Sequence, residues 1–216
     1  MKRTLSFLVL ASSAFASTVD STAHEVHAKI VYVSPTRELT SQSLQYIFDK
    51  TNPDSRGKKV VLAEKGVPTY DVLPLTLGSI RGYAVKVELV AFTLGPADSE
   101  LAKRLLENAD AVIFVADGAP DRASANQATL KQLKAVLAPR PLTWAAMPKV
   151  FQLDHRDLEG ALPIATLKQQ LGVTDEPTVE AVSRTGVGVF DALKAATKLV
   201  LLQLRGPAPD AGAKAH

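Results

Sequence analysis

Six consecutive apolar residues, Ala111-Val112-Ile113-Phe114-Val115-Ala116, constrain the fold of this chain more than any other feature of its sequence. A strand without a polar residue on either face is typical of the centre of a parallel sheet that helices cover on both sides. Further strands are predicted at 28–33, 58–62, 84–92, 150–153 and 179–182, and helices at 41–50, 98–108, 121–137, after Pro163 and after Gly188. This alternation predicts an α/β fold with right-handed crossovers and a mostly parallel, six-stranded sheet that has helices on both faces.

The composition excludes several classes of function. The chain has 216 residues, enough for one well-buried domain but not for two of ordinary size. It has no cysteine, which excludes disulfides and thiolate chemistry. The net charge is only +3, and no basic stripe is interleaved with aromatic residues, so we expect no nucleic-acid partner. His24 and His27 precede a predicted strand and no other His lies nearby in the sequence, so we expect no metal site there.

The two ends of the chain differ from its middle. In residues 1–16, Lys2 and Arg3 precede a short apolar run and an Ala14-Phe15-Ala16 cleavage pattern, as in a secretory signal whose removal would leave an exported protein. The run is too short to span a bilayer, so we predict no transmembrane span. Residues 17–27 are a polar lead-in, 28–205 are the folded domain, and 206–216, rich in Pro, Ala and Gly, are expected to be disordered.

The carboxyl ends of the predicted strands are where a parallel sheet binds its ligand. The loops at 34–40, 93–98, 117–120 and 154–157 should gather there, and the order of strand, loop, Ser41 and helix is that of a phosphate-binding loop.

Five stretches, 29–32, 44–51, 73–82, 112–117 and 185–194, resemble the MglA-type small GTPases of bacterial gliding motility. The resemblance covers about residues 26–205, and 73–82 and 185–194 are its most particular parts. It implies a P-loop NTPase fold of the Ras-like kind and a cytoplasmic location. It also implies GTP or GDP with magnesium as ligand, and as partner a roadblock-domain regulator or a motility and polarity complex.

The phosphate loop departs from the pattern of the family. Active members have G-x-x-x-x-G-K followed by Ser or Thr, in which the glycines admit the phosphates, the Lys neutralises them and the hydroxyl binds magnesium. Residues 34–41 keep only the final hydroxyl, Ser41, while Leu39 and Thr40 replace the second Gly and the Lys. Loss of the Lys alone removes a contact of roughly 1.5–3 kcal/mol. The carboxylate of Glu38 would repel a bound phosphate by on the order of 4 kcal/mol per unit charge. Arg37 could offset this repulsion only by turning inward from a position that is not that of the lost Lys.

The two switch regions also lack the residues that the resemblance requires for hydrolysis. The charge-stabilising Arg and the magnesium-contacting Thr fall at Gly66 and Val67, counted back from Tyr70. After Thr93, the second switch is about two residues shorter than in the family and has no Gln in register to orient water. We therefore predict no catalytic residue and no metal ligand.

The guanine-reading motif of the family, N-K-x-D, is Asp154-His155-Arg156-Asp157 in this chain. Asp157 keeps the carboxylate that accepts hydrogen bonds from guanine in the family. The alternative is that Asp157 only caps the turn before Leu158. Ser183 falls at the loop that backs the base, and the glycines at 186 and 188 are interpreted as a helix start rather than a phosphate cradle. If nucleotide binding is retained, its residues would be Arg37, Ser41, Asp154, Asp157 and Ser183.

Three functions stay open at this point. The first is a pseudo-GTPase that needs no cofactor and binds a protein partner through its switch surface. The second is a residual guanine-nucleotide binder or slow GTPase, with GTP or GDP and magnesium. The third is an exported adaptor that reuses the fold. For the first, the partner surface is predicted to be the loop at 63–72 and the helix at 98–107, with Pro68 and Pro96 restricting the backbone. On that helix we expect Leu101, Leu105 and Leu106 to face inward. We expect Glu100, Lys103 and Arg104 to face the partner or, alternatively, to form only a solvated face.

Overall fold

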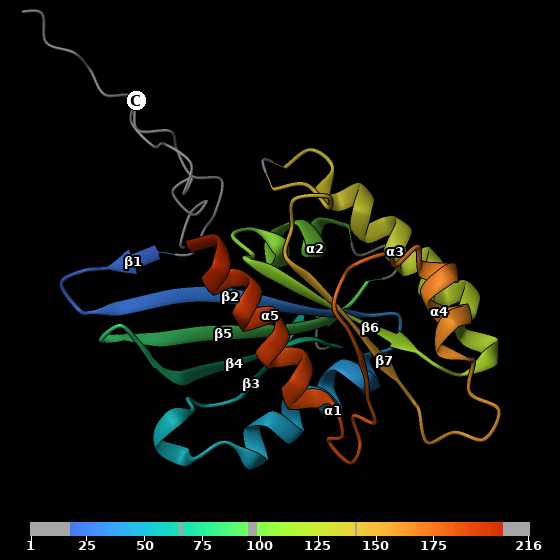
Figure 1. The fold of residues 1–216 in the computed structure, drawn as a ribbon, viewed down its shortest axis with the longest axis horizontal. Helices are drawn as coiled ribbons and strands as arrows, with labels where there is room; N and C mark the ends of the chain where they lie inside the picture. The colour runs from blue at the N-terminus through green and yellow to red at the C-terminus, as the bar shows by residue number, and fades with distance from the viewer. Residues whose placement is uncertain (1–17, 65–66, 95–98, 141, 205–216) are drawn as a thin grey trace, which may run out of the picture.

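One eight-stranded sheet runs through the computed structural model, which describes residues 18–64, 67–94, 99–140 and 142–204 (Figure 1). Its main path has the order β3-β4-β5-β2-β6-β7-β8, and β1 pairs with β2 beside this path. Strands β5, β2, β6, β7 and β8 are parallel, and β1, β3 and β4 run antiparallel to their neighbours. The strands are β1 Thr18–Asp20, β2 Glu25–Ser34, β3 Val60–Glu64, β4 Val67–Ile80, β5 Tyr83–Thr93, β6 Ala111–Asp117, β7 Lys149–Asp154 and β8 Thr178–Glu180.

Helices cover both faces of the sheet. On one face α1 and α5 pack over one buried cluster, and Figure 1 shows α5 crossing in front of the strands. On the other face α2, α3 and α4 pack over a second cluster. The helices are α1 Arg37–Lys50, α2 Ser99–Leu106, α3 Ala123–Leu137, α4 Ile164–Leu171 and α5 Val189–Leu204, with short 3-10 helices η1 Pro53–Ser55 and η2 Pro120–Arg122.

The apolar run at 111–116 forms most of β6, every residue of which is buried. Its side chains alternate between the two clusters, with Val112 and Phe114 toward α2 and α3, and Ile113 and Val115 toward α1 and α5. Burial of each such side chain stabilises the fold by about 1.5–3 kcal/mol. The predicted central strand is thus confirmed.

The sheet has two more strands than the six predicted. The missed strand β4 occupies the predicted loop at 63–72 and the stretch after it, and Pro74 and Gly78 within it obscured the strand pattern. Pro74 lies opposite Glu88 of β5, and its carbonyl accepts a hydrogen bond from Gly57 N at 2.8 Å. The other missed strand, β1, and the first residues of β2 lie in the predicted polar lead-in at 17–27, which is therefore partly sheet.

Helix α1 begins at Arg37, although residues 34–40 were predicted to be a loop and the helix to begin at Ser41. That prediction was wrong because residues 37–40 contain neither Gly nor Pro, and because Leu39 gains burial when it joins the helix. The connection from β2 to α1 is therefore only Pro35 and Thr36.

The predictions for 1–16 and 206–216 concern residues outside the described part of the chain. Among the helices that are described, none is long and apolar enough to cross a membrane.

Candidate nucleotide site

The end of β2 and the start of α1 occupy the place of the phosphate loop. Ser34 ends the strand, and its Oγ accepts a hydrogen bond from Thr36 N at 3.2 Å. Thr36 is the extended N-cap residue of α1 and makes no side-chain capping bond. A connection of two residues closes directly onto the helix, without the wide turn that exposes successive main-chain N–H groups to a phosphate.

The three positions that end the phosphate motif lie within α1. Leu39 is 0 % exposed and belongs to the cluster beneath α1 and α5. Thr40 is also buried, and its hydroxyl donates to Arg37 O at 3.0 Å. Ser41 Oγ is buried and has no hydrogen-bond partner among the described atoms. Leu39 and Thr40 are therefore enclosed by the fold, and so is the Ser41 hydroxyl.

Arg37, the cation nearest this position, is paired with a carboxylate. Its Nη2 donates to Oδ1 of Asp71, a buried residue of β4, and Lys59 Nζ lies 3.6 Å from the other oxygen of the same carboxylate. If Arg37 turned away, the buried carboxylate would keep only Lys59, and breaking a buried pair destabilises a protein by about 3–5 kcal/mol. Arg37 is therefore a structural partner of β4 in this conformation.

The first residue of the guanine-reading motif, Asp154, is a buried acceptor. It receives hydrogen bonds from Ser183 N at 2.9 Å and His155 N at 2.8 Å through Oδ1. Its Oδ2 accepts from Gln152 Nε2 at 2.8 Å and from the Ser183 hydroxyl. Asp154 and Ser183, both predicted site residues, thus lie together, and the carboxylate holds the loop that follows β8.

Two further members of this network were missed from the sequence. Ser43 of α1 lies with its hydroxyl 2.7 Å from Ser183 Oγ and 3.1 Å from Gln152 Nε2. The network therefore joins α1, β7 and the loop at 181–188. A signal was present in the sequence, because Gln152 is the one polar residue among Val150, Phe151 and Leu153 in a buried strand.

The remaining residues of the motif pair with protein groups. The His155 ring turns onto the end of β6, with Nδ1 2.7 Å from Asp117 Oδ1, and its backbone has a positive φ of 56°. Asp157 Oδ2 accepts from Arg184 Nη2 at 2.8 Å. That hydrogen bond lowers the pKa of the Asp157 carboxyl below its usual value. Within the turn before Leu158, the Leu158 N–H donates to the His155 carbonyl at 3.2 Å.

The glycines at 186 and 188 serve close packing. Both have positive φ, 85° and 73°, which side chains rarely adopt. A Cβ at Gly186 would lie 1.9 Å from the Tyr46 ring, and one at Gly188 would lie 2.0 Å from Glu180 O. They allow the loop to enter α5, as interpreted from the sequence.

The predicted partner surface is only partly described. On α2, Leu105 and Leu106 are buried and Leu101 packs against the same cluster, while Glu100 and Lys103 are exposed and paired at 2.6 Å. Arg104, the third predicted contact residue, is exposed as well. The predicted inward and outward sides of this helix are thus confirmed. Gly66 and the segment 95–98, including Pro96, lie outside the described residues, as does the side chain of Pro68.

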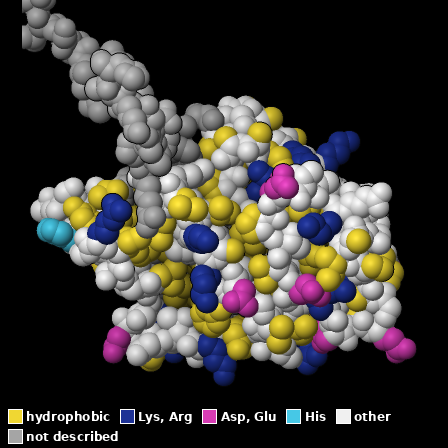
Figure 2. All heavy atoms as spheres, in the orientation of Figure 1, with side chains coloured by type: hydrophobic (Ala, Val, Ile, Leu, Met, Phe, Trp, Pro, Cys, Tyr) yellow, Lys and Arg dark blue, Asp and Glu magenta, His cyan; other side chains and the backbone are white. Residues whose placement is uncertain are grey.

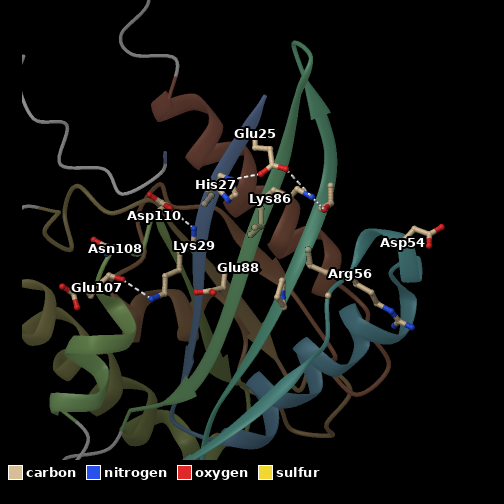
Figure 3. Close-up of a pocket in the computed structure, with 16 residues that line it drawn as sticks. Glu25, His27, Lys29, Asp54, Arg56, Lys86, Glu88, Glu107, Asn108 and Asp110 are labelled. Carbon is tan, nitrogen blue, oxygen red and sulfur yellow. Dashed lines mark hydrogen bonds and ion pairs between the residues drawn. The ribbon is translucent and has the colours of Figure 1, made fainter. Parts of the chain in front are cut away.

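A charged depression of 820 Å³ lies at the opposite end of the sheet, near the amino ends of β2, β5 and β6 (Figure 3). Its lining carries both signs of charge, and Lys86 Nζ lies 3.8 Å from Glu25 Oε1. The Lys29 ammonium donates to the backbone carbonyl of Glu107 at 3.1 Å, and the Lys29 backbone N–H donates to Asp110 Oδ2 at 2.7 Å. With carboxylates among its cations, this depression does not present a concentrated positive charge to a phosphate.

No family model matches the chain. It is 36 % identical over 191 residues to the Mutual gliding-motility protein MglA of Myxococcus xanthus (strain DK1622). The match covers 88 % of this chain and 98 % of that protein.

Proposed function

Because the chain belongs to the MglA family of Ras-like small GTPases, we propose that it acts in motility or polarity regulation as a pseudo-GTPase. In this role it has the Ras-like α/β fold of the family, binds a protein partner through its switch surface, and needs no bound nucleotide. The name of the relative, with its reference to gliding motility, supports the biological setting.

The position of Leu39 is the observation that carries this proposal. A phosphate loop presents main-chain N–H groups to an open cradle at the start of a helix. Formation of such a loop here would require the first turn of α1 to unwind and Leu39 to leave the core. Exposure of the leucine alone costs about 1.5–3 kcal/mol, before any unwinding of the helix is counted.

The charges at the site support the same conclusion. Thr40 stands at the Lys position, and Arg37 is held by Asp71. The Ser41 hydroxyl that would bind magnesium is buried in α1. The residues present therefore do not fit a magnesium-bound triphosphate, and no hydrolytic step follows from them.

The partner would contact α2 and residues 63–72, where β3 ends and β4 begins. In active small GTPases these switch segments change shape with the nucleotide, and regulators bind them for that reason. Here the buried Leu105 and Leu106 fix α2, and Glu100, Lys103 and Arg104 are left on its outer side. We propose a roadblock-domain regulator as the partner class, by analogy within the family.

A second candidate, a residual guanine-nucleotide binder, is favoured by the other half of the site. Asp154 and Ser183 keep the loop after β8 in place, and Asp157 stays close by with an anionic carboxylate. This half could still accept guanine if Arg184 released Asp157. It would supply base contacts without a phosphate cradle, so we expect at most weak binding of GTP or GDP.

Nucleotide content separates the two candidates. The protein is purified in magnesium without added nucleotide, denatured, and its supernatant analysed by anion-exchange chromatography beside an active small GTPase. A pseudo-GTPase releases no GTP or GDP, whereas the active control releases about one equivalent. Stoichiometric nucleotide from this protein would overturn the proposal and favour the second candidate.

A further inference from the structure

An apolar groove of 440 Å³ lies between α5 and the turn that joins β4 to β5, away from the candidate nucleotide site. Leu77 and Ile80 of the β4 end form one wall, and seven residues of α5 between Phe190 and Leu202 form the floor and the other wall. Figure 2 shows hydrophobic side chains gathered over the left part of the face that carries α5, with Lys and Arg side chains among them.

The spacing on α5 explains why this groove is apolar and elongated. Phe190, Leu193, Thr197 and Leu201 recur at steps of three and four residues, so they lie along one side of the helix. Leu201 comes eleven positions after Phe190, which corresponds to a helix length of about 17 Å at 1.5 Å per residue. Phe190 is 37 % exposed even though its ring packs edge-on against Tyr46.

Two of the leucines that line the groove remain partly open to solvent. Leu77 is 36 % exposed and Leu202 is 46 % exposed. The groove therefore keeps apolar surface open to solvent that a bound alkyl chain would bury.

The charges at the groove have a single sign. Lys194 and Lys198 line it, and no carboxylate does among the residues that the structure describes. Residues four apart are neighbours on a helix, with Cβ atoms about 5–6 Å apart, so both ammonium groups can reach one anion. The groove therefore combines a long apolar floor with a positive rim.

We propose that this groove binds a single-chain anionic amphiphile, of the class of long-chain fatty-acid carboxylates. The alkyl chain would lie along Phe190, Leu193 and Leu201, and the carboxylate would lie between Lys194 and Lys198. A volume of 440 Å³ is within the range of about 300–1,000 Å³ that small-molecule sites occupy. A membrane-binding surface would have apolar side chains that protrude into the bilayer, whereas the apolar side chains of this groove line a hollow.

The first test uses dodecanoate as the probe, titrated into the full chain by calorimetry below its micelle concentration. Saturable binding of one equivalent is expected. Decanoate should bind more weakly, because each methylene removed lowers the affinity about fourfold. Dodecyltrimethylammonium, with the same chain and the opposite charge, should bind at least tenfold more weakly than dodecanoate.

Two variants test the two parts of the site. Lys194→Gln with Lys198→Gln should lower the affinity for dodecanoate about tenfold and abolish the preference over the cationic probe. Lys131→Gln, an exposed lysine on α3, is the matched control and should change nothing. Thr197→Trp should abolish binding by filling the groove, while the melting temperature shows that the variant still folds.

The proposal is overturned if dodecanoate does not bind saturably, or if the double Lys variant binds both probes as the unmodified protein does. It is also overturned if the folded Thr197→Trp variant keeps its affinity. Binding to anionic phospholipid vesicles without binding of monomeric dodecanoate would mean that this face docks on a membrane instead. None of these outcomes depends on nucleotide, so they are independent of the proposed pseudo-GTPase role.

Discussion

Replacement of Leu39 by Ala tests most simply whether the former phosphate loop has become part of the core. Leu39 is 0 % exposed and packs in the cluster that α1 and α5 share over the sheet. Truncation of a fully buried leucine loses its transfer free energy and leaves a cavity, a loss of about 2–5 kcal/mol in the free energy of unfolding. An alanine keeps helix propensity, so the loss reports packing rather than helix formation.

The assay is equilibrium urea unfolding, followed by circular dichroism, with thermal melting as a second measurement. For a domain of this size each kcal/mol shifts the melting temperature by about 2–4 °C, so a drop of about 4–20 °C is expected. Leu202→Ala is the matched control, because Leu202 is also a helical leucine but is 46 % exposed. It should change the unfolding free energy by no more than about 1 kcal/mol.

The result that refutes this reasoning is a Leu39→Ala variant as stable as the Leu202→Ala control. Leu39 would then lie in an exposed loop, as the phosphate-loop pattern alone predicts. The first turn of α1 would be free to form a cradle, and the argument against nucleotide binding would lose its main support.

Three further predictions concern the rest of the site and the partner surface. The double variant Leu39→Gly with Thr40→Lys should partly restore GDP binding in calorimetric titration but should not restore GTP turnover. Turnover at the rate of an active small GTPase would contradict the interpretation of the switch regions. Asp154→Asn should lower the unfolding free energy by about 1–3 kcal/mol in urea titrations, because the amide NH₂ would face groups that are themselves donors. An unchanged urea midpoint would show that this network does not need the carboxylate. Lys103→Glu with Arg104→Glu should abolish recovery of the partner in a pull-down without lowering the melting temperature, and unchanged recovery would place the interface elsewhere.

Much of the fold could be predicted from hydrophobic patterning. The run at 111–116 identified the central strand, and the three- and four-residue spacing after Gly188 identified α5. Strand β4 could not be predicted in the same way, because Pro74 and Gly78 are residues that strands usually exclude. Strand β5 follows it directly after Arg81 and Gly82, so the two strands form a local hairpin that the strand pattern did not identify.

The candidate site could be located from the sequence, but its hydrogen bonds could not. Asp154 and Ser183 were identified at matching motif positions, and they do lie in contact. The pairing of Arg37 with Asp71 joins residues 34 positions apart, and that of Asp157 with Arg184 joins residues 27 apart. Motif positions specify which residues approach a ligand in active relatives. When the motif is lost, the hydrogen-bond partners of these residues depend on how the chain packs.

The central claim, that no phosphate cradle forms at the start of α1, is tested most directly by a thermal-shift titration with GTP and magnesium. Ligand that binds only the folded state raises the melting temperature in proportion to RT ln(1 + [L]/Kd), so millimolar GTP would reveal a micromolar site by a shift of several degrees. The account predicts no shift up to millimolar GTP, with an active small GTPase as the positive control. A rise that begins at micromolar GTP and grows with the logarithm of its concentration would contradict it.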